Sequence, residues 1–445
     1  MIASILISLT SLFVLLYVLR RRRRLSLGLP LAYLASLLLI HVPGAVAHLL
    51  AGGFLLDDEA TKTGMFYTAI GVVCFVAGVG IVRTFSKADS HFAPADRRNF
   101  SLFCLIAGLA VVYGLSRLAK IPSLGAAIDK GGAIWILGCI LGLRAAVDAR
   151  SVTRILGWIA ALSVYPALML LVGGFLSYGS AAIIVVISVL AVSARRYWRA
   201  SAGVAFAAFF GVTLFVSYFE LRDDIRSDVW GGASMSQRVS TVSGMFTHLH
   251  LIDPTSQKDL DSLDLRLNQN RFVGLAVERI RDGQVDKLWG RSVWDSFIAL
   301  IPRAYWPDKP ETGGSGDIVA DMTGLDLNRD TSWGVGNVME FYVNFGAAGV
   351  VCGFLILGLV LGWLDLRVAS TERTGRLGDT FLYFLPAAAM IQPGGSLMEI
   401  VGGAGAALLA ALGWRWIWNR WARFRNWSGL LKMVRISDPH PRLGS

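Results

Sequence analysis

The chain has 445 residues, of which 54% are hydrophobic and 16% charged, with a formal net charge of +11 at pH 7. Charged residues make up about a quarter of a soluble domain, so this composition excludes an ordinary soluble protein and indicates one that crosses a membrane many times. Most of the positive residues lie in short segments between apolar runs, where they set the orientation of spans rather than bind nucleic acid. No nucleic-acid partner is expected.

Apolar runs long enough to cross a bilayer recur along the whole chain. About 20 apolar residues form a helix that spans a hydrocarbon core of ~30 Å, and about eleven runs approach this length. We therefore predict an all-α polytopic membrane protein with about eleven transmembrane helices and one long external loop that carries short amphipathic helices. The predicted spans are residues 2–19, 27–50, 66–82, 100–115, 134–146, 155–175, 181–194, 202–219, 345–364, 381–391 and 400–418.

The first apolar run is predicted to be an uncleaved span rather than a signal peptide. No small-x-small cleavage pattern follows it, and the five arginines from Arg20 to Arg24 come after the run instead of before it.

Clusters of positive residues fall in every second segment between the predicted spans, and Lys and Arg near span ends are retained in the cytoplasm. This alternation predicts an external N-terminus and a cytoplasmic C-terminus. The predicted cytoplasmic segments are 20–24, 83–98, 144–154, 195–199, 367–376 and the tail after residue 414; the predicted external segments are 57–59, 117–130, 173–180, 220–344 and 393–399.

These patterns divide the chain into four parts. Residues 1–219 form transmembrane helices 1 to 8, residues 220–344 the large external loop with the candidate active site, residues 345–418 helices 9 to 11, and residues 419–445 a basic cytoplasmic tail. Within the loop, residues 271–281 have apolar residues at a helical period, and the apolar segment 293–301 suits a helix at the membrane surface.

Cations are unexpectedly frequent in the external loop, which holds ten arginines and three lysines. Guanidinium groups bind phosphate oxygens through paired hydrogen bonds, so these residues predict a pyrophosphate site for a lipid-linked substrate. The alternative is a solvated loop of mixed charge, because acidic residues there outnumber basic ones. The candidate substrate-binding cations are Arg117, Arg222, Arg226 and Arg271, and the candidate catalytic cations are Arg303 and Lys309.

Glu340 is the candidate general base. It stands between Met339 and Phe341 just before an apolar run, where a carboxylate is costly to bury and therefore suggests function. Removal from water would make it a stronger base. The alternative is an ion pair that fixes the loop to the span.

The remaining candidates bind sugars or complete the chemistry. Trp306 and Tyr342 could stack on sugar rings or anchor the chain at the interface, and Asn344 follows closely. His248 and His250 in the loop are less favoured bases. The four cysteines fall inside predicted spans and form no metal-spaced cluster, so neither a metal nor a cofactor is expected. Nucleotide-binding motifs are absent, which implies a donor carried by a lipid.

Two segments carry a family resemblance: Ile301-Pro-Arg-Ala-Tyr-Trp-Pro-Asp-Lys-Pro310, and Glu340-Phe-Tyr-Val-Asn-Phe-Gly346-Ala-Ala-Gly349. They resemble the O-antigen polymerase (Wzy-type) and related exopolysaccharide repeat-unit polymerases. The resemblance implies a glycosyltransferase of the bacterial inner membrane that joins oligosaccharides linked to undecaprenyl pyrophosphate at the periplasmic face. It gives Arg303, Lys309, Glu340 and Asn344 the best claim to function. A chain-length regulator and a flippase are its expected partners.

The predicted mechanism is direct displacement at the anomeric carbon of the donor. Loop arginines and Lys309 would stabilise the departing pyrophosphate, and Glu340 would take the proton of the acceptor hydroxyl. Three alternatives stay open: an O-antigen ligase, which the two loop histidines keep in view; a peptidoglycan polymerase; and a transporter or flippase, which the nearly charge-free spans disfavour.

Overall fold

The computed structural model describes residues 1–52, 55–86, 97–114, 124–168, 170–171, 177–194, 221–247, 255–301, 314–326 and 333–436, with a few isolated positions between these ranges. Every regular element in this part of the chain is a helix, which confirms the all-α class. The α-helices in chain order are α1 (Ile2–Arg21), α2 (Leu29–Leu39), α3 (Val42–Ala51), α4 (Asp58–Phe85), α5 (Arg97–Gly114), α6 (Leu124–Gly131), α7 (Ile134–Asp148), α8 (Val152–Leu168), α9 (Ser177–Ser193), α11 (Met235–Thr247), α12 (Gln257–Leu267), α13 (Gln269–Arg281), α14 (Arg291–Ala299), α15 (Ser315–Thr323), α16 (Asn337–Arg373), α17 (Leu377–Met390) and α18 (Leu397–Ile436).

Several of these helices are long and apolar enough to span a membrane. Within the described ranges there are six: Ile2–Arg21, Leu29–Ala51, Asp58–Phe85, Gly125–Asp148, Asn337–Arg373 and Leu397–Phe424. Three shorter apolar helices accompany them, at Val152–Val164, Ala182–Ser193 and Leu377–Met390. The chain is therefore a membrane protein by the length and composition of its helices. The predicted count of about eleven is not reached in the described part, and most of the predicted span 202–219 lies outside it.

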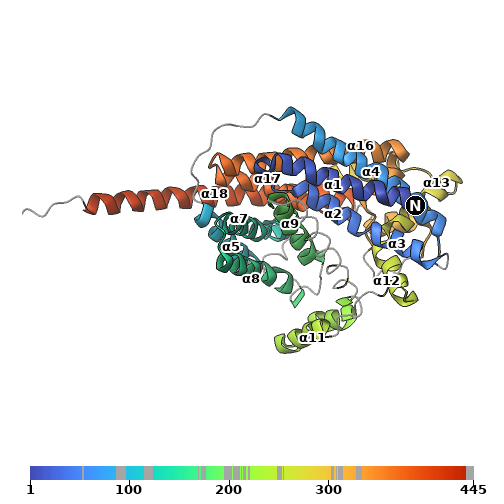
Figure 1. Cartoon of the computed structure of the whole chain (residues 1–445), viewed down its shortest axis with the longest axis horizontal. Helices are drawn as coiled ribbons and strands as arrows, with labels where there is room; N and C mark the ends of the chain where they lie inside the picture. The colour runs from blue at the N-terminus through green and yellow to red at the C-terminus, as the bar shows by residue number, and fades with distance from the viewer. Residues whose placement is uncertain are drawn as a thin grey trace, which may run out of the picture.

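Helices α1, α4 and α16 lie side by side along the long axis of the molecule (Figure 1). α4 and α16 approach so closely that a Cβ at Gly78 would lie 2.4 Å from the Leu355 carbonyl oxygen, and one at Gly358 would lie 2.2 Å from that of Phe75. Only glycine fits such a crossing. We call the end of the bundle with the C-termini of α1, α4 and α16 the arginine end, and the opposite end, beside α12 and α13, the loop end.

Two helices of the bundle are interrupted. The predicted span 27–50 is two helices, α2 and α3, separated at Ile40 and His41. In α16 the backbone leaves helical geometry at Phe345 (φ −136°, ψ 15°) and Gly346 (φ 64°, ψ −150°). The helix itself begins at Asn337, so the last eight residues of the predicted loop form the first turns of α16. We call Asn337–Asn344 the half-helix.

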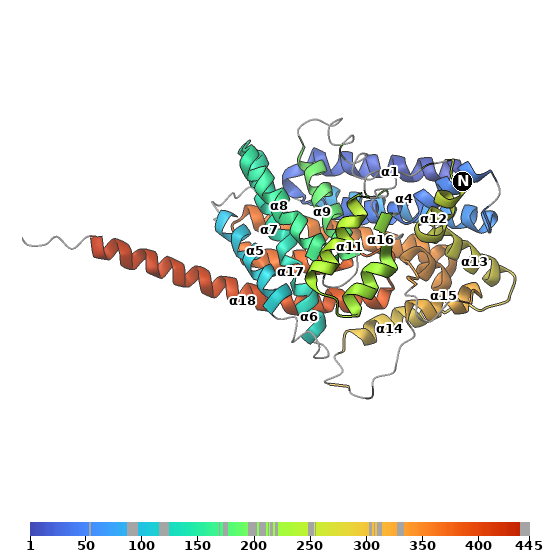
Figure 2. The ribbon, with the colours of Figure 1, turned by 90° about the horizontal axis from the view of Figure 1, so that it is seen from below.

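The loop helices α12, α13 and α14 pack directly on the bundle (Figure 2). α13 lies against α4, where a Cβ at Gly274 would lie 1.9 Å from the Ala60 carbonyl oxygen, and the residue before α13, Asn268, meets Gly44 of α3 equally closely. α14 lies along α18, with the Ala299 side chain against Gly402. These contacts make α12 to α14 part of the folded core.

A buried ion pair connects three segments at the arginine end. The guanidinium of Arg83 in α4 donates to the carboxylate of Asp365 in α16, and both side chains are buried. Asp365 also accepts hydrogen bonds from the Ser26 hydroxyl (2.6 Å) and from the backbone N–H groups of Leu27 (2.9 Å) and Leu29 (3.2 Å). A buried charge is tolerated when it is paired and hydrogen-bonded in this way.

Candidate functional site

The half-helix of α16 ends because of its glycine. At φ 64° and ψ −150°, Gly346 occupies a region that side chains almost exclude. The turn that follows also brings Gly349 against the half-helix, where a Cβ would lie 2.1 Å from the Phe341 carbonyl oxygen. The sequence Phe-Gly-Ala-Ala-Gly therefore builds a break in α16 near the loop end.

Asn344 joins this break to the loop. Its amide group donates to the Glu340 carbonyl oxygen (2.7 Å) and to the Ser292 hydroxyl (2.8 Å), and its oxygen accepts from the Gly290 N–H (3.0 Å). The Leu288 N–H donates to the Val343 carbonyl oxygen (2.8 Å). These bonds use carbonyl groups that the end of a helix leaves without partners. Asn344, predicted as a substrate contact, is fully buried and serves this connection.

Two glycine-rich segments meet at the start of the half-helix. The N–H groups of Gly336 and Asn337 donate to the carbonyl oxygens of Gly394 (3.2 Å) and Pro393 (2.9 Å). A Cβ at Gly334 would lie 2.1 Å from the Gly394 carbonyl oxygen, so the two segments touch through their backbones. The buried Tyr33 hydroxyl donates to the Asn337 side chain (2.7 Å). Irregular backbone at membrane depth is tolerated when it is satisfied by protein in this manner.

Glu340 lies inside this arrangement and is fully buried. Its Oε2 accepts from the Leu397 N–H at the start of α18 (2.6 Å), where the helix dipole favours a negative charge. The Ser292 hydroxyl interacts with the carboxylate as a hydrogen-bond donor, and Glu399 is a negative neighbour. Among the described residues, no donor meets both the distance and the angle of a full hydrogen bond to Oε1. Glu340 is therefore held firmly through Oε2 and more weakly through Oε1.

Lys287, which was not predicted from the sequence, lies at the same break in α16. Lys287 Nζ would lie 3.4 Å from a Cβ on Gly346 and stands 5.4 Å from the centre of the Trp289 ring. It thus occupies the C-terminal end of the half-helix, where the dipole favours a cation. Trp289 is 73% exposed and Trp294 66% exposed. The break therefore carries a cation and exposed aromatic surface in addition to the buried carboxylate.

A cavity of about 420 Å³ opens on the other face of the half-helix. Tyr342 contributes to its wall, and its ring centre lies 4.7 Å from that of Tyr67 in α4, with the two rings tilted by 58°. Lys62 and Arg281 supply two positive charges, and Phe66, which is 54% exposed, completes the aromatic side. We call this the α4–α13 cavity. Because residues two apart on a helix point in different directions, Tyr342 faces this cavity while Glu340 does not line it.

The two cations of the cavity already have acidic neighbours. Lys62 pairs with Asp58 and Glu59, each at 2.8 Å, and Arg281 pairs with Asp282 at 3.1 Å. These pairs are largely exposed and therefore weak. A polyphosphate with more charge than a single carboxylate would compete for the same groups.

A second group of cations lies elsewhere on the loop. Arg222 and Arg226 are in the helical segment 221–230, and Arg266 is at the end of α12. Burial, with repulsion from Arg226, lowers the pKa of the Arg222 guanidinium, and burial with repulsion from Arg222 lowers that of Arg266. The structure therefore brings two predicted phosphate contacts together and adds Arg266 to them.

The other predicted site residues are placed neither at the α4–α13 cavity nor with the Arg222, Arg226 and Arg266 group. Arg271 donates to the Asp57 carboxylate (2.7 Å), which fixes α13 to the start of α4. Trp306 is 37% exposed. The remaining candidates lie outside the described residues: Arg117, Arg303, Lys309, His248 and His250.

Lys62, Lys287 and Ser292 were not predicted from the sequence because their sequence context is ordinary. Lys62 follows an acidic stretch, Ser292 is an ordinary small residue, and only the Lys287-Leu-Trp289-Gly290 stretch pairs a cation with an aromatic residue before a helix. Their significance depends on α13 and α14 packing beside the half-helix. No group of three or more metal-ligating side chains occurs in the part of the chain that the structure describes.

Comparison with known proteins gives one result. No curated protein and no solved structure matches the chain. A family model described as a domain of unknown function, DUF8712, matches residues 54–378. The matched region begins just before α4 and ends at the start of α17, so it contains the α4–α13 cavity, the half-helix and the whole loop of residues 220–344. The chain therefore belongs to the DUF8712 family.

Proposed function

We propose that the protein is a membrane glycosyltransferase that uses an oligosaccharide linked to a lipid pyrophosphate and extends a glycan at the loop end. The observation that carries this proposal is the α4–α13 cavity, which combines two cations with three aromatic side chains where α4, α13 and the half-helix meet. Phosphate, sugar and lipid are the three chemical groups that such a lining can hold together.

Each part of the cavity has a role in this proposal. Lys62 and Arg281 bind the pyrophosphate and stabilise the charge that develops as it leaves the anomeric carbon. Tyr67 and Tyr342 stack on the sugar next to the phosphate. Phe66 lies on the exposed side of α4 and contacts the lipid chain. Arg303 and Lys309 remain proposed partners of the pyrophosphate, on a segment that adjoins α14 in the sequence.

Transfer replaces the bond between the anomeric carbon and the phosphate oxygen by a bond to the acceptor oxygen, and the acceptor hydroxyl loses its proton. Glu340 is the proposed acceptor of that proton through Oε1, which receives no full hydrogen bond from the described residues. Its carboxylate is fully buried. The step therefore requires the half-helix to move about the break at Phe345 and Gly346.

The test compares two arginines of α13. In a deletion strain complemented with Arg281→Gln, surface and secreted glycan should shorten toward single repeat units on a carbohydrate gel, with about a tenfold or greater loss of long polymer, because one charge-assisted contact to the leaving group is lost. Arg279→Gln is the matched control, since Arg279 bonds to Gln284 and Asp321 and does not line the cavity. Equal ladders from both variants would contradict the proposal. Long polymer left on its lipid carrier would indicate a ligase.

Transport of a lipid-linked glycan is a second candidate because of the interrupted helices. α2–α3 and α16 are both broken, and transporters place their sites at such breaks. The bundle also buries Arg83 and Asp365, whereas the spans were expected to be nearly free of charge. Movement of a fluorescent lipid-linked saccharide across proteoliposomes without polymer formation would favour this candidate.

A further inference from the structure

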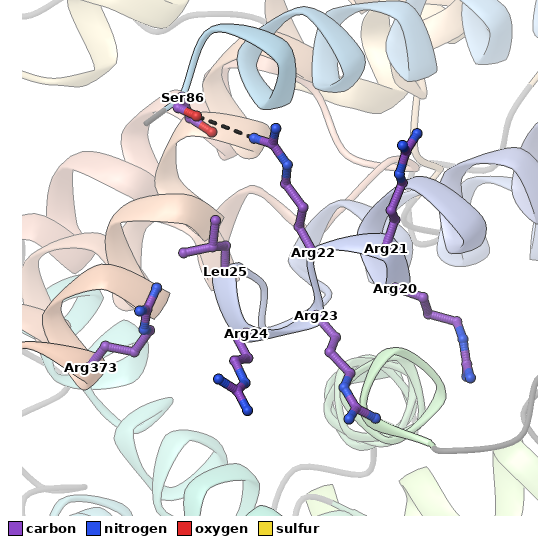
Figure 3. Close-up of a pocket in the computed structure, with 8 residues that line it drawn as sticks. All are labelled: Arg20, Arg21, Arg22, Arg23, Arg24, Leu25, Ser86 and Arg373. Carbon is purple, nitrogen blue, oxygen red and sulfur yellow. Dashed lines mark hydrogen bonds between the residues drawn. The ribbon is translucent and has the colours of Figure 1, made fainter. Parts of the chain in front are cut away.

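The arginine end contains an open hollow of about 680 Å³ that is far from the proposed active site along the bundle. It is lined by the five arginines from Arg20 to Arg24, by Leu25 and Ser86, and by Arg373 from the end of α16. Figure 3 shows the arginine side chains spreading from the turn after α1, with Arg22 directed at Ser86. No carboxylate is among the described residues that line it. We call it the arginine basin.

The backbone around the basin is held in place by hydrogen bonds that do not use the guanidinium groups of Arg21, Arg23 and Arg24. Asp365 accepts from the N–H groups of Leu27 and Leu29, which fixes the turn into α2. Arg22 donates to the carbonyl oxygens of Arg83 (2.9 Å) and Ser86 (3.2 Å). The basin is therefore preorganised, and an anion that enters it does not have to order the turn.

Three of the arginines are available to a ligand. Arg21, Arg23 and Arg24 are exposed, and no ion pair to them is found within the part of the chain that the structure describes. Like charges held this close repel one another, and an anion with several oxygens relieves that repulsion. Positive residues anywhere around a span end would set its orientation equally well, so the placement of six arginines around one hollow calls for a further explanation.

A cleft with one apolar side continues from the basin. This second hollow, of about 180 Å³, shares Leu25, Ser86 and Arg373 with the basin. It adds Trp363 and Leu366 on its apolar side, and Arg367, Ser370 and Thr374 as polar lining. The Arg367 guanidinium lies 5.5 Å from the centre of the Trp363 ring, and Trp363 is 45% exposed. An exposed tryptophan stacked with an arginine is typical of the level where lipid headgroups begin. The two hollows together thus offer a cationic compartment beside an apolar surface at headgroup depth.

We propose that the arginine basin binds the phosphate headgroup of an anionic lipid, whose acyl chain lies along Trp363 and Leu366. The lipid sits at the end of the bundle that the positive residues predict to be cytoplasmic, opposite the proposed transfer site. Basic pockets between membrane helices on that side recognise lipid phosphates. A soluble phosphate would use the same arginines but not the apolar side of the cleft, and this difference separates the two sources of the anion.

The experiment uses the purified full-length protein in detergent, titrated with dioleoyl phosphatidylglycerol, dioleoyl phosphatidylcholine or inorganic pyrophosphate, with bound molecules counted by native mass spectrometry. The test variant is Arg21→Gln with Arg23→Gln and Arg24→Gln. The matched control is Arg98→Gln with Arg420→Gln and Arg423→Gln, which removes the same charge from exposed arginines outside the basin. Size-exclusion chromatography establishes that each variant is folded.

We expect the wild type and the control to bind phosphatidylglycerol about tenfold or more tightly than phosphatidylcholine, and the test variant to lose that preference. The three corresponding Arg→Lys changes should retain most of it, and Trp363→Ala should weaken lipid binding without affecting pyrophosphate. Equal preference in test and control variants would overturn the proposal. Pyrophosphate binding as tight as that of phosphatidylglycerol would also overturn it, in favour of a soluble anion. If the glutamine variant does not fold, the lysine and Trp363→Ala variants decide the question.

Discussion

The two ends of α16 each carry a buried carboxylate that binds the first N–H groups of another helix, yet the two are satisfied differently. At the arginine end, Asp365 accepts from Leu27 and Leu29 at the start of α2, and Arg83 neutralises its charge. At the loop end, Glu340 accepts from Leu397 at the start of α18 through Oε2, while Oε1 receives no full hydrogen bond from the described residues.

We infer from this difference that Asp365 serves the fold and that Glu340 is the better candidate for a role in activity. A buried carboxylate with a paired cation and hydrogen bonds on both oxygens is satisfied within the fold, and removing one partner is costly. A buried carboxylate with one incompletely bonded oxygen is the better candidate for a role in chemistry. We therefore expect substitution at Asp365 to affect folding first and substitution at Glu340 to affect activity first.

The largest effect is expected from Asp365→Asn. The change leaves the Arg83 charge buried without its partner and should lower the free energy of unfolding by about 3–5 kcal/mol. Fluorescence-detected size-exclusion chromatography after heating would show an early loss of the folded peak. Replacing both partners, with Arg83→Met and Asp365→Leu, should be less harmful because no charge is stranded. A double variant as unstable as the single one would refute this explanation.

A smaller effect is expected from Gly346→Ala. The alanine side chain is strained at φ 64° and ψ −150°, so the break should cost about 1–3 kcal/mol to maintain. The control is Gly80→Ala within α4, where a Cβ meets nothing within 4 Å and where alanine favours a helix by about 1 kcal/mol. Thermal melting of both variants in detergent checks the contrast. Similar melting temperatures would show that the break at Phe345 and Gly346 tolerates a side chain.

The smallest change in stability is expected from Glu340→Gln. The amide oxygen can still accept from the Leu397 N–H, so the free energy of unfolding should change by about 1 kcal/mol or less. Glycan transfer should nevertheless be lost, because an amide does not take a proton from the acceptor hydroxyl. A folded variant that still makes long polymer would leave Glu340 with a purely structural role.

A large part of the fold was predictable from the chain itself. Apolar run length identified α1, α4, α16 and α18, because a helix is the simplest way to satisfy backbone groups in lipid. The break at Ile40 and His41 was missed, although Pro43 stands in the first turn of α3, because the apolar run continues on both sides of it. A segment distant in the chain stabilises this break, since the Gln269 N–H donates to the Ile40 carbonyl oxygen (3.0 Å).

The candidate site was predicted less completely. Glu340, Tyr342 and Asn344 stood out because polar residues at the edge of an apolar run are costly, and all three lie on the half-helix. Lys62, Arg281 and Lys287 could not be recognised, since each is an ordinary surface cation until α13 and the 287–290 segment are placed beside the half-helix.

By itself the sequence determined that this is a helical membrane protein with its polar residues concentrated in one loop, because hydropathy and span length depend only on local composition. Tertiary structure alone decided which face of the half-helix carries Glu340 and which lines a cavity, and that Arg373 lines the same hollow as the arginines of the turn after α1. Those outcomes depend on contacts between segments distant in the chain, such as the pairing of Gly336 with Gly394 and of Arg83 with Asp365. No local pattern encodes which of many apolar helices will be neighbours.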